Sequence, residues 1–253
     1  MFNIIDSTSD VEYNKKSMIR KEKFITGEHY HIYSRTILNV PEFKNNSNAK
    51  KLHQAFLLGN STNSGQAFGY LRDNKDNPKA LEKAIEISQK GKKLVDILCY
   101  SIMPDHYHLL LKELKNNGVT DFVRRCNTSI AKYINVKNNR LGSLFESNFK
   151  AKHIDTNEYL LHLSVYINLN PLDFISGKEW RFNKLKKWAL IKQKLINYPW
   201  SSAKFFLNEH QHDLILSGTE IILSQFKNTN DYERFVREWS ESEVASTSDV
   251  EYE

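Results

Sequence analysis

The chain has 253 residues, of which 40% are hydrophobic and 12% aromatic, the composition of a folded globular protein rather than a disordered one. No apolar run approaches the roughly 20 residues needed to cross a membrane. The first residues lack the basic-then-apolar order of a signal peptide, and two cysteines give no disulfide framework, so a cytoplasmic location is expected. The net charge of +6 favours polyanionic partners such as nucleic acid, although solvated lysine faces produce the same balance.

The first third of the chain alternates between strand-like and helix-like patterns. Residues 1–20 form a polar segment, and the run from Glu28 to Thr36 alternates aromatic or apolar with polar residues, which predicts a strand. Apolar spacing from Asn48 to Leu58 predicts a short helix. Turn-forming residues over 59–77 predict a loop or insertion, and Pro78 suits the first turn of a helix that continues to Gln89.

The middle of the chain carries two strands, a helix, a strand and a helix. They are predicted as strands Lys93 to Ile102 and His106 to Glu113, a helix from Thr120 to Val136, a strand from Leu144 to Ile154 and a helix from Asp155 through Leu169. The short break between the first two strands favours an antiparallel hairpin. With the N-terminal elements, this order predicts one layered α/β domain, an antiparallel sheet covered by helices.

The last of these helices has a predicted start and a predicted end. Asp155 and Glu158 have the spacing of a capping box, with Asp155 as the N-cap. Pro171 is expected to end the helix because the residue before a proline resists helical geometry. After Asp173 the sequence becomes basic, aromatic and mostly helical.

Two histidines leave the same face of the second hairpin strand. Side chains at positions i and i+2 of a strand point to one side, so His106 and His108 can reach one metal ion. Two half-exposed histidines beside a turn would have the same pattern, because two ligands alone do not make a metal site. A third ligand and a reacting group are needed.

The helix before Pro171 offers both groups. Tyr166 and Asn170 are four residues apart, so a hydroxyl nucleophile and an amide oxygen lie one turn apart on one helix face. Ordinary packing would instead make Tyr166 a core residue and Asn170 a polar residue at the helix end. Tyr159, one heptad earlier on much the same face, is an alternative candidate nucleophile.

Five segments, in order along the chain, carry a resemblance to a known family. They are HIYSR (31–35), MPDHYHLLL (103–111), GSLFESNFK (142–150), YINLNP (166–171) and YPWSS (198–202). Through them the chain resembles the HUH single-strand tyrosine transposases, and more narrowly the REP-associated tyrosine transposases of the IS200-like family. The resemblance runs from about Glu28 to Trp239, and residues 59–77 look enlarged against that family.

The resemblance implies a ferredoxin-like or RRM-like α/β (α+β) fold, an antiparallel sheet covered by helices with a helical C-terminal extension. The implied catalytic domain covers residues 21–174, the basic helical extension 175–240 and a polar tail 241–253.

The resemblance also implies a chemistry. His106, His108 and Asn170 would bind one Mg²⁺ or Mn²⁺ ion, which would orient the scissile phosphate for attack. Tyr166 would be the nucleophile, forming a 5′-phosphotyrosine and leaving a free 3′-hydroxyl. The implied partners are single-stranded DNA hairpins, with the protein acting as a monomer or homodimer in the cytoplasm, at the nucleoid.

Basic residues are the predicted DNA contacts. Between Lys178 and Lys204 the sequence mixes lysine and arginine with three tryptophans, a combination that can hold phosphates and stack on unpaired bases. An amphipathic helix docked on the domain, with its lysines in water, would have the same pattern. The predicted contacts are Arg35, Lys150, Lys184, Lys186 and Lys187.

Three functions fit these patterns. The first is an active transposase or a domesticated relative that still cuts and rejoins single-stranded DNA. The second is a hairpin-binding protein without cleavage activity, and the third is a metal-dependent phosphodiesterase or RNA nuclease without a covalent step. The intact set of His106, His108, Tyr166 and Asn170 favours the first, because a protein that only binds DNA need not retain all four.

Overall fold

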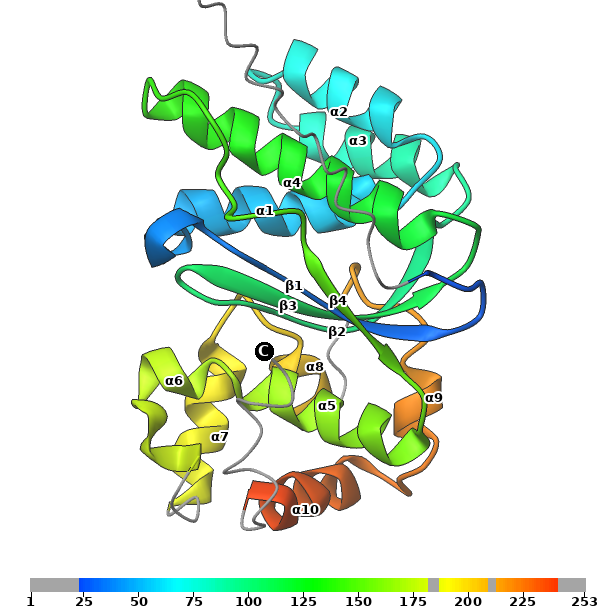
Figure 1. Ribbon diagram of the computed structural model, residues 1–253, viewed down its shortest axis with the longest axis vertical. Helices are drawn as coiled ribbons and strands as arrows, with labels where there is room; N and C mark the ends of the chain where they lie inside the picture. The colour runs from blue at the N-terminus through cyan, green and yellow to red at the C-terminus, as the bar shows by residue number, and fades with distance from the viewer. Residues whose placement is uncertain (1–22, 182–186, 209–212, 241–253) are drawn as a thin grey trace, which may run out of the picture.

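The computed structural model describes residues 23–181, 187–208 and 213–240, and Figure 1 shows a central sheet with helices above and below it. Within these ranges, no helix combines the length and the apolar character needed to cross a lipid bilayer. Cys99 and Cys126 are buried free thiols.

The sheet has four strands, and each pair of neighbours is antiparallel. Its order is β2-β3-β1-β4. The strands are β1 (His29–Arg35), β2 (Val95–Ile102), β3 (His106–Glu113) and β4 (Lys150–Ile154). Because β3 lies between β1 and β2, and helices join these two strands, the arrangement is the split βαβ, or ferredoxin-like, topology. The predicted fold class and the predicted β2–β3 hairpin are confirmed.

One face of the sheet is covered by the helices that precede β2 and follow β3. They are α1 (Asn46–Gly59), α2 (Ser64–Asp73), α3 (Ala80–Gln89) and α4 (Gly118–Lys137), and two short 3-10 turns, Ile37–Asn39 and Glu42–Lys44, lead into α1. The alternation of β3 sends Tyr107, Leu109 and Leu111 into this core, against residues of α1 and α4. The α2–α3 pair has a small cluster of its own around Leu58, Ala67 and Ala84.

The other face is covered by α5 and the helices after it. They are α5 (Asn157–Leu169), α6 (Leu172–Ile175), the 3-10 turn Lys178–Arg181, α7 (Trp188–Asn197), α8 (Ala203–Leu207), α9 (Glu220–Leu223) and α10 (Thr229–Ser240). Apolar residues of β2 and β3, such as Leu98 and Leu110, pack with α5, α7, α8 and α10 in a second hydrophobic core. The C-terminal extension is therefore helical, as the sequence indicates, and it shares a core with α5.

The extension also lengthens the sheet. Ser101 and Ser201 form an isolated antiparallel bridge, and the Ile102 amide donates to the Trp200 carbonyl at 2.8 Å. The Ser202 amide donates in turn to the Tyr100 carbonyl at 2.9 Å. Residues of the YPWSS segment thus satisfy the outer edge of β2, which would otherwise present unpaired backbone groups.

Two predicted elements are wrong in extent. Residues 59–77 contain α2, because Ala67 and neighbouring apolar residues pack against α3 and override the many turn-forming residues around them. The predicted strand from Leu144 starts only at Lys150, and before it residue Phe145 forms a single bridge with Thr36.

The predicted N-cap of the helix that carries Tyr166 is wrong, while its predicted end at Leu169 is confirmed. The N-cap of α5 is Thr156, not Asp155, and its hydroxyl accepts from the Tyr159 amide at 3.1 Å. Asn170 keeps helical angles in spite of the following proline, and Pro171 becomes the N-cap of α6. A proline fits there because the first turn of a helix needs no amide donor from it.

Gly118, the first residue of α4, is expected to be intolerant of a side chain. A Cβ at this position would lie 2.3 Å from the Leu94 carbonyl oxygen, which is backbone and cannot swing away. Gly118→Ala should therefore lower the free energy of unfolding by about 1–3 kcal/mol in urea titrations. Gly65→Ala in α2 is the control, since a Cβ there meets nothing within 4 Å and should stabilise by up to about 1 kcal/mol. Equal effects of the two substitutions would contradict this assignment.

Candidate active site

Three histidines gather on the face of the sheet that α5 covers. His106 and His108 lie on this face of β3, and their rings are 5.0 Å apart between centroids and nearly perpendicular. His31 comes from the adjacent strand β1 and its ring stacks on that of His108 at 5.1 Å. The prediction that His106 and His108 share one side of a strand is confirmed by this geometry.

Each of the two β3 histidines has a hydrogen-bond partner at Nδ1. His106 Nδ1 lies 2.6 Å from Asp105 Oδ1, and His108 Nδ1 lies 2.9 Å from His31 Nε2. A carboxylate accepts only, so Nδ1 of His106 donates the hydrogen in the neutral ring. Asp105 thereby selects the His106 tautomer that is protonated at Nδ1, which leaves a lone pair on Nε2.

Burial keeps the His31 ring unprotonated. At Asp105, hydrogen bonding and nearby positive charge outweigh the effect of burial on the carboxyl pKa. Desolvation, with a smaller contribution from the charge of Lys152, lowers the pKa of His31 to about 3, so this ring is neutral at neutral pH. At Asp105 burial opposes ionisation, but hydrogen bonding to His106 and the charges of His106 and Arg35 hold the carboxyl pKa below its ordinary value. Neutral His31 can accept a hydrogen from His108 Nδ1, while Asp105 stays a carboxylate beside His106.

Tyr166 of α5 packs edge-on against the histidines. Its ring centroid lies 5.6 Å from that of His108 and 6.5 Å from that of His31, with interplanar angles of 86° and 80°. Tyr166, His108 and His31 are all fully buried. The rival candidate Tyr159 lies two turns earlier, where Lys152 Nζ sits 5.0 Å above its ring. The described ring contacts of Tyr166 are therefore with His108 and His31, whereas the described contact of the Tyr159 ring is with Lys152.

Asn170 follows α5 and is 1% exposed. Its amide donates to the Tyr166 carbonyl at 2.9 Å, so the helical path continues from one residue to the other. The two side chains lie one turn apart on the buried side of the helix, as the sequence spacing predicts.

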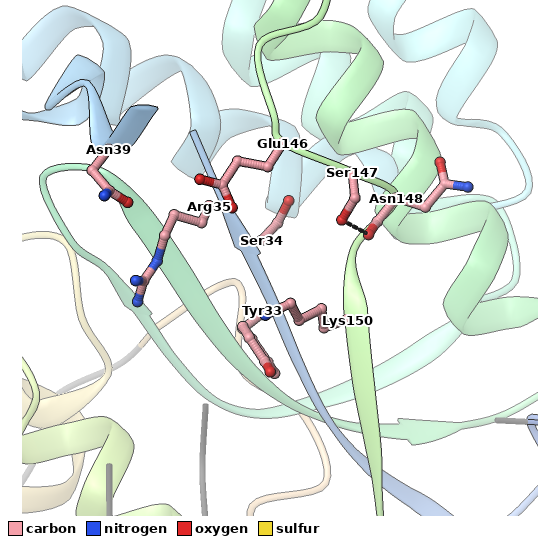
Figure 2. A pocket seen from close by; sticks show the side chains of 8 residues that line it. All are labelled: Tyr33, Ser34, Arg35, Asn39, Glu146, Ser147, Asn148 and Lys150. Carbon is pink, nitrogen blue, oxygen red and sulfur yellow. Dashed lines mark hydrogen bonds between the residues drawn. The ribbon is translucent and has the colours of Figure 1, made fainter. Parts of the chain in front are cut away.

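A polar pocket opens at the ends of β1 and β4 (Figure 2). It has a volume of about 180 Å³, and its lining includes Tyr33, Arg35, Glu146, Asn148 and Lys150. The Tyr33 ring stacks on that of His108 at 5.8 Å, and Lys150 Nζ lies 5.2 Å above the Tyr33 ring. Two of the predicted DNA contacts, Arg35 and Lys150, thus line one hollow next to the candidate metal ligands.

The other predicted DNA contacts do not join this pocket. Lys184 and Lys186 lie outside the described residues. Lys187 is exposed and is the N-cap residue of α7, with a left-handed φ of 60°. No contact of Lys187 with the histidines is present among the described residues.

Sequence reasoning missed His31, Tyr33 and Glu146 as site residues. His31 and Tyr33 alternate on β1 with the same period as His106 and His108 on β3, which is the signal that they share a face. The distance along the chain hid the partnership, because register between β1 and β3 follows from the fold and not from local pattern. Glu146 lies in the segment that was predicted as a strand.

The helix α5 is held in place through Asn168, on a different side from Tyr166. The Ser202 hydroxyl donates to Asn168 Oδ1 at 2.7 Å, and Asn168 Nδ2 donates to the Tyr232 hydroxyl at 3.2 Å. Ser202 also accepts from the Tyr100 amide of β2 at 3.0 Å. All of these side chains are buried, so the network ties α5 to the sheet edge and to α10.

Asn168→Ala is expected to lower the free energy of unfolding by about 1–3 kcal/mol. It leaves two buried hydroxyls, those of Ser202 and Tyr232, without the amide that bridges them. Urea unfolding checks this value, with Glu158→Gln on the exposed start of the same helix as the control, expected to change stability by no more than about 0.5 kcal/mol. A decrease in the free energy of unfolding no larger than that of the control would show that this network does not stabilise the protein.

Metal binding here would need an amide ligand. Among the described residues there is no group of three His, Cys, Asp or Glu side chains arranged to hold a metal ion. The predicted donors are the imidazoles of His106 and His108 and the carboxamide of Asn170, which is buried one helical turn beyond Tyr166. Imidazole nitrogen with amide oxygen suits a divalent cation that keeps open positions for a phosphate.

Comparison with known proteins finds a family match for part of the chain. Residues 71–170 match the family model described as "Transposase IS200 like", and this range contains β2, β3, α4, β4 and α5. Over this segment the chain is similar to the IS200-like transposases. The segment includes His106, His108, Tyr166 and Asn170, so the resemblance stated from the sequence motifs is confirmed.

Two further comparisons accompany this match. A solved structure of a REP-associated tyrosine transposase bound to a REP hairpin is similar to the chain with a TM-score of 0.46 and 12% identity, over 79% of this chain and 90% of that one. No curated protein matches the chain.

Proposed function

We propose that the protein is a metal-dependent endonuclease and strand transferase that cuts and rejoins single-stranded DNA through Tyr166. The observation that carries the proposal is the packing of Tyr166 against His108, 5.6 Å between ring centroids, inside the segment that matches the IS200-like transposases. A phenol beside an imidazole pair matches the needs of a tyrosine nucleophile that works next to a cation.

His106, His108 and Asn170 are the proposed ligands of one Mg²⁺ or Mn²⁺ ion. Both histidines make their described hydrogen bonds through Nδ1, to Asp105 and His31, which favours coordination through Nε2. The bound ion would act as a Lewis acid on the scissile phosphate. Asp105 and His31 then act as positioning residues that orient the two imidazole rings.

In the proposed step, the Tyr166 oxygen forms a bond to phosphorus and the bond from phosphorus to the 3′ oxygen breaks. The phenol proton passes to water, and the departing 3′ oxygen takes up a proton to become a hydroxyl. The DNA 5′ end stays on the protein as a phosphotyrosine ester. Because this ester conserves the bond energy, the 3′-hydroxyl of another strand can reverse the step without ATP.

Arg35 and Lys150 are the proposed contacts of the DNA backbone at this site. Both line the polar pocket next to His108, so a strand held there would lie beside the histidines. Lys184, Lys186 and Lys187 are proposed as further backbone contacts on the basic extension. The proposed substrate form is a DNA hairpin with a single-stranded flank, on the strength of the motif resemblance.

A second candidate function is hairpin binding without cleavage. The observation that favours it is the complete burial of Tyr166, His108 and His31. In that case α5 would act as a lid that closes the histidine site, and the DNA contacts would be made by the exposed basic residues alone.

Cleavage of a labelled hairpin oligonucleotide tests the choice between these two. We expect Mn²⁺-dependent cleavage, blocked by a chelator, that yields a 3′ end which a polymerase can extend and a 5′ end that stays bound to protein. Binding with no cleavage in the presence of Mn²⁺ or Mg²⁺ would support the binding-only function. A product with a free 5′-phosphate would contradict the covalent step.

A further inference from the structure

A large basic groove lies on the helical layer, across the sheet from Tyr166. It is bounded by α1, α2 and α4, has a volume of about 1290 Å³, and its lining includes five lysines, three arginines and no carboxylate. Most of α2 precedes the segment that matches the IS200-like family, and the groove exists because α2 forms its far wall.

The positive charge of this groove is only partly balanced nearby. Arg72 and Arg124 form ion pairs with Asp73 and Asp121, at 2.8 and 3.1 Å, outside the lining. Lys50 of α1 and Lys132 of α4 are exposed on two helices that pack side by side along the groove, and neither has an ion-pair partner within the described part of the chain. A polyanion that entered the groove would meet cations from α1, α2 and α4.

The floor of the groove offers aromatic surface and close approach to backbone. Phe68 of α2 and Tyr133 of α4 are half-buried in the lining. Lys51 Nζ and Lys137 Nζ lie 5.9 and 5.7 Å from the centroid of the Tyr133 ring. Gly65 of α2 has nothing within 4 Å of the position that a Cβ would occupy, so a ligand can approach the α2 backbone closely there.

We propose that this groove is a second DNA-binding site, which holds single-stranded DNA away from the cleavage site. Cations on α1, α2 and α4 can follow a phosphate backbone, and the half-buried side chains of Phe68 and Tyr133 in the lining can contact unpaired bases, which a duplex keeps stacked inside. The choice of DNA as the ligand rests on the proposed function, but the groove itself does not include Tyr166 or the histidines. A strand in the groove lies on the other face of the sheet and leaves the polar pocket open.

Charge reversal at Lys50 and Lys132 tests the proposal. Fluorescence anisotropy with a labelled single-stranded 30-mer is measured over a series of salt concentrations for the full chain, for Lys50→Glu with Lys132→Glu, and for Lys79→Glu with Lys227→Glu. The last pair is exposed, lies outside the groove and changes the net charge equally. Loss of two phosphate contacts should lower the salt slope by about 1.4 and weaken binding about tenfold near 0.15 M salt.

A milder pair, Lys50→Gln with Lys132→Gln, should show a smaller change in the same direction and guards against a folding defect. Binding and salt slope equal to those of the control pair would overturn the proposal. So would a loss confined to duplex DNA, since that would make the groove a duplex site.

The test of the groove can fail or succeed independently of the test of the proposed cleavage activity. Tyr166→Phe should leave the groove-dependent part of single-strand binding unchanged. Groove-dependent binding by a protein that never forms a covalent product would refute the proposed cleavage and leave the second site standing. Covalent product formation with no effect of the groove variants would refute the second site alone.

Discussion

Tyr166→Phe is expected to abolish the covalent protein–DNA product and to lower the cleavage rate by at least about 10³-fold, since loss of a covalent nucleophile removes the reaction path itself. The substitution deletes one oxygen and keeps the ring that packs against His108 and His31. Binding of hairpin DNA should therefore be retained. Single-turnover cleavage and anisotropy on the same preparation measure the two effects separately.

Tyr159→Phe is the matched control for this result. It makes the same chemical change on the same helix, two turns before Tyr166, at a ring whose described contact is with Lys152. Its cleavage rate should stay within about twofold of the unmodified protein, because the hydroxyl of the half-buried Tyr159 lies two turns away from the proposed reacting groups. Loss of cleavage in Tyr159→Phe with retention in Tyr166→Phe would reverse the assignment of the nucleophile.

The second large effect is expected at His106. His106→Ala should weaken Mn²⁺ binding at least about 100-fold, because residues that merely orient a metal ligand already change affinity about 10–100-fold. Its side chain is 13% exposed and lies beside the polar pocket, so it is easier to truncate than the fully buried His108. Isothermal titration with Mn²⁺ measures the affinity without any need for activity.

His153→Ala controls for the loss of an imidazole. His153 is a half-exposed residue of β4 that pairs with Glu28, and exposed pairs of this kind contribute about 1 kcal/mol or less. We expect unchanged Mn²⁺ affinity and normal folding for this variant. Equal Mn²⁺ affinity in His106→Ala and His153→Ala would remove His106 from the metal site.

The sequence predicts the parts of this protein that depend on local pattern. The alternation around His106 and His108 predicts β3 and their common face, and the four-residue spacing of Tyr166 and Asn170 predicts their common side of α5. These inferences hold because strand and helix periods are fixed by backbone geometry.

The parts that depend on contacts between distant residues could not be predicted. The bond between His31 and His108 joins residues 77 positions apart, and only the β1–β3 register brings them together. Helix α2 owes its stability to packing on α3, which its turn-rich composition conceals. The role of Ser202 in holding Asn168 likewise exists only once the extension has folded back onto β2.

Mass spectrometry of the covalent product tests the central claim most directly. After incubation with Mn²⁺ and a hairpin oligonucleotide, followed by nuclease and protease digestion, a nucleotide-linked peptide should be recovered with the modification on Tyr166. Attachment at Tyr159 or at any other residue, or cleavage that leaves no peptide modified, would contradict the account.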